Sequence, residues 1–390
     1  MKKVLILAIA FMLVFALAAC GGGGGGGSTD TGSTGSNNNA TNNDTGDPGA
    51  SAGSLGIGFI YIGAINDGGF TQTHHNGTIK LMAEYGDAVT VKWLENIDDG
   101  NAQACKDAAM QLIDQGSTVI IGTSFGFGTP LFEMAESGDY DGITFIHFSG
   151  YHINDHNYGN YFGAMEEPRY LSGMIAGMQT TTNKLGYVAA YPYTEVKIGI
   201  NAFALGAQSV NPDATLSVVY INSWYDPAME KQAAEALLAQ GCDVITQHAD
   251  TPGPQLAAAE AGAFAIGYNL DNSGLEGLED AFLTAPVWNH ENFLIPTIKA
   301  IMDGVWKPES YYGTMADGYV MLAPLTKNVT SEARSAVEEV QSKIIAGNYP
   351  IFTGPIYDNE GNEVVAAGQS LDRGGIWQIE YHVKGVTASE

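Results

Sequence analysis

The chain has 390 residues, of which 45% are hydrophobic and 10% aromatic, and its formal net charge at neutral pH is −27. A chain of this length and composition exceeds what one hydrophobic core usually holds, so we expect two packed lobes. The negative charge argues against nucleic acid as a partner, because phosphate groups would be repelled, and against a basic membrane-binding patch.

Residues 1–19 have the pattern of a signal peptide. Lys2 and Lys3 precede an apolar run that is too short for a stable transmembrane helix, and small residues lead up to Cys20. The pattern resembles a bacterial lipobox, in which the cysteine receives a diacylglycerol and becomes the mature N-terminus; a plain signal peptide is the alternative. We therefore expect an extracytoplasmic protein that is anchored to the cell membrane through lipid on Cys20.

Residues 20–54 have the composition of a flexible linker. Seven consecutive glycines follow Cys20, and Ser, Thr, Asn, Asp and Gly dominate the remainder. Such a segment cannot bury enough apolar surface to offset its chain entropy, and it would span on the order of 30 Å. No later segment is long and apolar enough to cross a bilayer.

From residue 55 onward, strand-like and helix-like segments alternate. We predict strands at 56–62, 89–94, 118–122, 144–148, 184–190, 215–222, 242–246 and 264–268, and helices at 72–85, 102–115, 130–137, 169–179, 195–210, 227–240 and 255–261. This order is typical of parallel sheets with helices on both faces. The pattern restarts near residue 169, which predicts two similar α/β lobes with a cleft between them. Cys105 and Cys242 are expected to be buried free thiols.

The residues that follow the predicted strands are rich in aromatic, amide, hydroxyl and carboxylate groups and contain no lysine or arginine. They lie at 66–70, 124–127, 149–151, 223–226, 247–250 and 268–271. In open parallel sheets, ligands bind outside the carboxyl ends of the strands. These residues therefore predict a flat ligand with polar edges that is not an anion, although each one taken alone can equally be a loop cap or a core residue.

Several long segments, in the same order along the chain, resemble the basic-membrane-protein family of lipoproteins, which are nucleoside- and nucleobase-binding receptors of ABC importers. Among them are INDGGFTQTHHNG, TSFGFGTP, YFGAMEEPRYLSGMIAG, NSWYDP and AIGYNLD. The resemblance implies a type I periplasmic-binding-protein fold, in which two Rossmann-like lobes enclose the ligand. It implies a first lobe at 55–162 plus about 284–322, and a second at 163–283 plus about 323–390.

The resemblance also implies which residues bind the ligand. Phe70 and Trp224 would stack on the two faces of a purine, and Asp67 and Asp271 would bind its edges. The complete set of predicted ligand contacts is Asp67, Phe70, Ser124, Phe125, Gly150, Tyr151, Trp224, His248, Asp271 and Trp288.

Two departures from the family pattern favour a free nucleobase, adenine in particular, over a nucleoside. Nucleoside-binding relatives carry an acidic residue after the strand at 144–148, where this chain has Ser149, Gly150 and Tyr151. Those relatives also carry a lysine near the ribose, in the region where this chain has Trp288 and Asn289. We expect an ABC permease and ATPase as partners, a monomer, and neither a cofactor nor a metal ion.

Three alternatives remain open from the sequence. A nucleoside hydrolase would need an aspartate cluster around calcium, and no DxDxxxD-type run is present. A metal receptor could use His147, His152 and His156, but these histidines fit surface and capping roles better. A sensor that presents its ligand to a membrane receptor would have the same sequence features as a transport receptor.

Overall fold

The structure of the protein is a computed structural model that describes residues 53–389. The predicted signal peptide, Cys20 and all but the end of the predicted linker lie outside the described residues. None of the helices in the described part combines the length and the apolar character that a bilayer-spanning helix needs.

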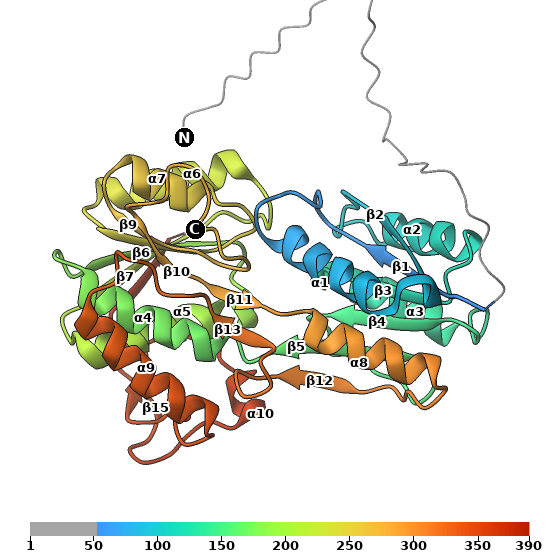
Figure 1. Cartoon of the computed structure of the whole chain (residues 1–390). Coiled ribbons are helices and arrows are strands. Elements are labelled where there is room, and N and C mark those ends of the chain that lie inside the picture. Colours follow the sequence, from blue (N-terminus) through green and yellow to red (C-terminus); the bar gives the residue numbers. More distant parts are fainter. Residues whose placement is uncertain (1–52, 390) are drawn as a thin grey trace, which may run out of the picture. The chain divides into compact units, whose positions relative to one another are not determined.

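The first sheet contains, within the described residues, six parallel strands in the order β12-β5-β4-β3-β1-β2 (Figure 1). The strands are β1 (Leu55–Ile60), β2 (Val89–Leu94), β3 (Val119–Gly122), β4 (Thr144–Phe148), β5 (Tyr158–Gly163) and β12 (Ser310–Gly313). Ile120 and Ile121 of β3 are both fully buried, yet they belong to separate hydrophobic clusters. Successive side chains of a strand point to opposite faces, so both faces of this sheet are covered.

Helices on the two faces of this sheet complete the first lobe. On one face, α1 (Phe70–Tyr85) and α8 (Glu291–Met302) pack against each other and share a cluster with Ile121. On the other face, α2 (Ala102–Asp114) and α3 (Gly128–Glu136) share a cluster with Ile120. Two short 3₁₀ turns connect these elements, η1 (Gly86–Ala88) before β2 and η2 (Phe125–Phe127) before α3.

The second sheet also consists of six parallel strands among the described residues, in the order β10-β9-β8-β6-β7-β16. The strands are β6 (Lys184–Ala189), β7 (Thr215–Tyr220), β8 (Val244–His248), β9 (Phe264–Ile266), β10 (Phe282–Thr284) and β16 (Val386–Ser389). The helices of this second lobe are α4 (Glu166–Gln179), α5 (Thr194–Val210), α6 (Pro227–Ala239), α7 (Gly253–Glu260) and α9 (Ser331–Ile345).

Glycines set the close packing of α4 on α5. A Cβ atom on Gly173 would lie 2.0 Å from the carbonyl oxygen of Phe203, and one on Gly206 would lie 2.0 Å from that of Tyr170. No larger residue fits at either position without separating the two helices. This close pair holds the start of α5, and with it Glu195, at a fixed place beside the sheet.

Short elements join the two lobes and finish the chain. β11 (Pro286–Trp288) pairs antiparallel with β13 (Val320–Leu322) where the chain passes between the lobes, and β14 (Ile356–Tyr357) pairs with β15 (Glu363–Val365). The last helix is α10 (Arg373–Ile376).

The predicted alternation of strands and helices is confirmed, and β2 and β4 have the predicted bounds. Helix α1 begins at Phe70 instead of residue 72, because Asp67 caps it. The strands β5 and β16 and the helices α8 and α9 are among the elements that the sequence patterns do not predict. The lobe boundaries inferred from the resemblance stay a prediction. Cys105 and Cys242 are both buried and free, as predicted.

Candidate functional site

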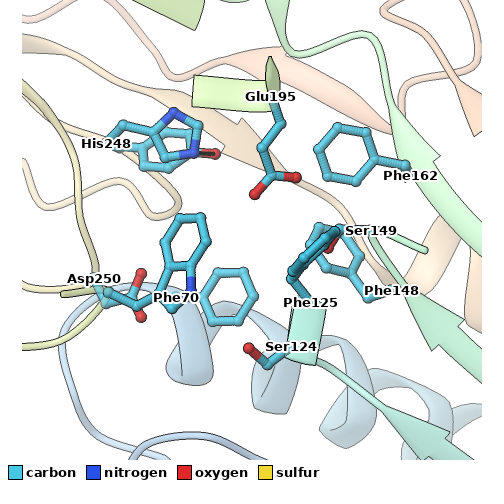
Figure 2. A pocket seen from close by; sticks show the side chains of 11 residues that line it. Phe70, Ser124, Phe125, Phe148, Ser149, Phe162, Glu195, His248 and Asp250 are labelled. Carbon is cyan, nitrogen blue, oxygen red and sulfur yellow. Dashed lines mark hydrogen bonds between the residues drawn. The ribbon is translucent and has the colours of Figure 1, made fainter. Parts of the chain in front are cut away.

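A pocket lies between the two lobes and takes residues from both. From the first lobe it is lined by Phe70, Ser124, Phe125, Phe148, Ser149 and Phe162, and from the second by Glu195, Trp224, His248, Asp250 and Tyr268 (Figure 2). The space between these side chains that no protein atom fills is about 390 Å³, part of it open to solvent. Most lining residues lie at or just beyond the carboxyl end of a strand, as predicted from the parallel sheets.

Aromatic rings make up most of the wall. Phe70, the first residue of α1, packs edge-on against His74 at 4.8 Å and Phe148 at 5.7 Å between ring centroids. Trp224 follows β7 and contacts Tyr191 and His248, with centroids 5.3 and 6.3 Å apart. Each ring is therefore held by neighbours of its own lobe, so the aromatic wall is preorganised in the ligand-free protein.

Asp67 has a structural role beside the pocket. Its carboxylate accepts hydrogen bonds from the backbone N–H groups of Gly69, Thr71 and Gln72 at 2.8–3.0 Å, which caps the N-terminus of α1. Burial raises the pKa of Asp67, and these hydrogen bonds oppose the shift. Asp67 does not line the pocket. It positions Phe70, and its predicted contact with the ligand remains a prediction.

Three further predicted contacts also lie off the pocket lining. Asp271 is exposed and accepts a hydrogen bond from the backbone N–H of Ser273. Tyr151 is 72% exposed, with its ring against His152. Gly150 lies against the His147 ring, and its neighbour Ser149 lines the pocket in its place.

Trp288 lies one layer behind the wall. It is buried, its Nε1–H donates to Asn269 Oδ1 at 3.0 Å, and its ring contacts Phe148 at 5.2 Å and Phe162 at 5.3 Å. Because Phe148 and Phe162 both line the pocket, Trp288 supports the wall from behind.

Two carboxyl groups in the lining are absent from the predicted set. Figure 2 shows the side chains of Glu195 and Asp250 directed at the pocket from different sides. Within the described residues, neither carboxyl accepts a hydrogen bond or forms an ion pair. Burial raises the pKa of Glu195 to about 8. Burial, followed by the charges of Asp67 and Glu230, raises the pKa of Asp250 well above its ordinary value.

The sequence held a signal for both carboxyls. Asp250 was in the segment after the strand at 242–246 but was not selected as a ligand contact. Glu195 begins a predicted helix five residues after the end of the predicted strand at 184–190. It lies outside the segments that directly follow the predicted strands, so it is absent from the predicted set. An unpaired carboxyl inside an aromatic pocket is costly unless a ligand donates to it.

Some of the other polar groups of the lining already have partners. Ser124 donates its hydroxyl hydrogen to Asp99 at 2.6 Å, and His248 Nε2 lies 3.3 Å from the Tyr268 hydroxyl. Burial, assisted by the charge of Arg169, lowers the pKa of His248 well below its ordinary value, so its ring is neutral at pH 7. Within the described residues, the side chains of Ser149 and Trp224 make no hydrogen bond, so they offer free hydrogen-bonding groups to a ligand beside those of Glu195 and Asp250.

The histidines that were weighed as metal ligands are spread over different environments. His147 is buried and its Nε2 is 2.7 Å from the carbonyl oxygen of Ser124, whereas His156 is exposed. His152 stacks on Phe132. Over residues 53–389, no three His, Cys, Asp or Glu side chains are arranged to hold a metal ion.

Comparison with known proteins identifies the family. Residues 55–353 match the Bmp family, described as ABC transporter substrate-binding protein PnrA-like. The chain is 36% identical over 332 residues to a purine-binding protein of Brucella abortus, covering 85% of this chain and 93% of that protein. It is 35% identical over 312 residues to TsgA13, a candidate glucose-binding protein of an ABC transporter in Haloferax volcanii, covering 80% of this chain and 77% of that protein.

Solved structures support the fold. A solute-binding protein of an ABC transporter system from Aeropyrum pernix superposes with a TM-score of 0.66 at 18% identity, covering 78% of this chain and 93% of that chain. The two-lobed type I periplasmic-binding-protein fold is thus shared, as the sequence predicts. The chain belongs to the Bmp family of PnrA-like ABC transporter substrate-binding proteins.

Proposed function

We propose that the chain binds a purine nucleobase, with adenine favoured, in the pocket between its lobes. The observation that carries this proposal is the combination of an aromatic wall with two unpaired carboxyl groups, Glu195 and Asp250. A purine presents two flat π faces to aromatic rings and a periphery of N–H donors and ring-nitrogen acceptors to the carboxyls. The purine-binding relative from Brucella abortus supports the same ligand class.

A free base fits the lining better than a nucleoside. Among residues 53–389, no lysine or arginine lines the pocket, and Trp288 already donates its single indole N–H to Asn269. A ribose would therefore find few free donors for its hydroxyl groups. A sugar such as glucose, suggested by the name of the Haloferax volcanii relative, needs hydrogen bonds around its whole periphery, whereas aromatic rings make up most of this wall.

The biological setting completes the proposal. Cys20 would carry the lipid that anchors the protein outside the cytoplasmic membrane, and the linker at 20–54 would hold the binding lobes away from the lipid. The receptor would deliver its ligand, as a monomer, to an ABC permease that an ATPase energises. It would perform no chemistry on the ligand and need no cofactor or metal ion.

Titration calorimetry tests the ligand. We expect one adenine per protein molecule, weaker binding of adenosine, and no measurable binding of glucose under the same conditions. Saturable glucose binding without any purine binding would overturn the assignment. Adenosine binding tighter than adenine would keep the ligand class and correct the choice of base over nucleoside.

The contact between the lobes provides a second prediction. A Cβ atom on Gly69 would lie 2.0 Å from the carbonyl oxygen of Asp250, and nearby Asn272 donates from Nδ2 to the carbonyl oxygen of Gly68 at 3.1 Å. Gly69→Ala therefore forces the lobes apart where the pocket closes. At a cost of about 1–3 kcal/mol, we expect adenine affinity to fall roughly 5- to 150-fold.

The matched control for that variant is Gly142→Ala, because a Cβ atom at Gly142 meets nothing within 4 Å. Calorimetry gives the affinities, and thermal unfolding without ligand shows whether each lobe stays folded. Unchanged adenine affinity in Gly69→Ala would show that the ligand-bound state does not need this contact.

A further inference from the structure

A fully buried arginine lies behind the pocket without a counterion. Arg169 of α4 is 0% exposed, and none of the ion pairs among the described residues includes it. Within the described part of the chain, its guanidinium makes one hydrogen bond, from Nη1 to Thr246 Oγ1 at 3.5 Å, while Nε and Nη2 have no partner. A buried guanidinium is costly unless a negative charge and hydrogen-bond acceptors compensate it.

Aromatic rings compensate this charge only in part. The guanidinium carbon lies 3.9 Å from the centre of the Tyr268 ring and 5.3 Å from that of Tyr187. Such cation–π contacts stabilise the positive charge, but they do not accept hydrogen bonds from the N–H groups that lie in the plane of the guanidinium. The free N–H groups of Arg169 still require acceptors.

The two nearby glutamates do not supply them. Glu166 accepts hydrogen bonds from the Tyr312 hydroxyl, and the cation that lowers its pKa is Arg373. Glu195 forms no ion pair with Arg169 or with any other described residue. Neither carboxyl therefore acts as the counterion.

Other unpartnered polar atoms gather in the same place. The Tyr187 hydroxyl on β6 and His248 Nδ1 on β8 are buried and lack partners. A Cβ atom built on Gly199 of α5 would lie 3.3 Å from the Tyr187 hydroxyl, 3.5 Å from His248 Nδ1 and 3.6 Å from Arg169 Nε. Unpaired polar atoms from three elements therefore surround the position beside Gly199 that a larger side chain would fill.

We propose that this space beside Gly199 is a binding site for a small monovalent anion of the halide class, such as chloride. The anion accepts hydrogen bonds from Arg169 and the Tyr187 hydroxyl and neutralises the guanidinium. A water molecule could accept the same hydrogen bonds, but it could not neutralise the charge of the guanidinium. The occupant lies behind His248 and Tyr268, which line the ligand pocket, so it would hold both side chains in place.

Bromide provides the direct test, because it replaces chloride and scatters anomalously. Crystals of the ligand-free protein grown in sodium bromide should show an anomalous peak within hydrogen-bond distance of Arg169 Nε and the Tyr187 hydroxyl. An ordered water at that position with no anomalous signal would overturn the proposal. The test needs no purine, so its failure says nothing about the proposed ligand.

Thermal unfolding of the ligand-free protein provides the test in solution. Replacing sodium gluconate by sodium chloride at equal ionic strength should raise the melting temperature by about 2–4 °C. Gly199→Ala fills the space with a methyl group that meets only side-chain atoms at 3.3 Å or more, so this variant should fold and lose the chloride response.

Two further variants complete this test. Arg169→Met should lose the response as well, whereas Gly274→Ala, whose Cβ atom meets nothing within 4 Å, should keep it. A chloride response that persists unchanged in Gly199→Ala would overturn the proposal.

Discussion

Trp224→Ala is expected to weaken adenine binding by roughly 30- to 1,000-fold while the protein stays folded. Trp224 lines the pocket after β7, is only partly buried, and is held in place by Tyr191 and His248. Truncating a central aromatic anchor of a binding site typically costs about 2–4 kcal/mol, which corresponds to that range of dissociation constants. Titration calorimetry measures the change directly.

Tyr151→Ala is the matched control for this prediction. Tyr151 was also predicted from the sequence as a ligand contact, but it is 72% exposed and lies off the pocket lining. We expect its removal to leave adenine affinity unchanged. The melting temperatures of both variants without ligand should match that of the unchanged protein within a few degrees. If Trp224→Ala binds adenine normally, the aromatic wall does not hold the ligand and the proposed function is wrong.

The contrast between Trp224 and Tyr151 shows what the sequence could and could not predict. The strand-end rule together with the family resemblance led to Phe70, Ser124, Phe125, Trp224 and His248, and all five line the pocket. The same reasoning led to Asp67, Asp271 and Tyr151, because a cap, an exposed loop residue and a ligand contact have the same composition. The conformation of each loop decides whether such a residue caps a helix, faces solvent or contacts the ligand.

Residues inside elements were harder to recognise. Phe148 on β4 and Phe162 on β5 have the pattern of core residues, and Trp288 does pack behind them. Whether such a ring faces the core or the cleft depends on how the lobes meet, which no local pattern encodes. The edge strand β16 escaped prediction for a related reason, because three of its four residues are exposed.

The adenine affinity is expected to fall as the pH rises above about 8. The carboxyl of Glu195 has a pKa raised from its ordinary value of 4.5 to about 8, because the half-buried side chain is desolvated in the pocket and has no partner among the described residues. It is therefore neutral at pH 7 and offers one O–H donor beside one acceptor. Adenine presents an amino donor next to a ring-nitrogen acceptor, which matches the neutral carboxyl.

Ionisation of Glu195 removes that match. Above its pKa the carboxylate has acceptors only, and each further pH unit should weaken adenine binding by up to about tenfold. Guanine presents two adjacent N–H donors, so its affinity relative to adenine should rise over the same interval. Burial and the charges of Asp67 and Glu230 also raise the pKa of Asp250 well above its ordinary value, so substitutions are needed to separate the two carboxyls.

Calorimetry from pH 6 to pH 10 with Glu195→Gln and Asp250→Asn separates these effects. Glutamine keeps one donor and one acceptor at every pH, so Glu195→Gln should bind adenine at pH 7 within a few-fold of the unchanged protein and show a flat profile. Asp250→Asn should retain the decline above pH 8, and any slope that remains in Glu195→Gln comes from Asp250 or from the ligand itself. A large loss of adenine affinity in Glu195→Gln at pH 7, or an affinity that rises with pH in the unchanged protein, would mean that Glu195 binds the base as a carboxylate.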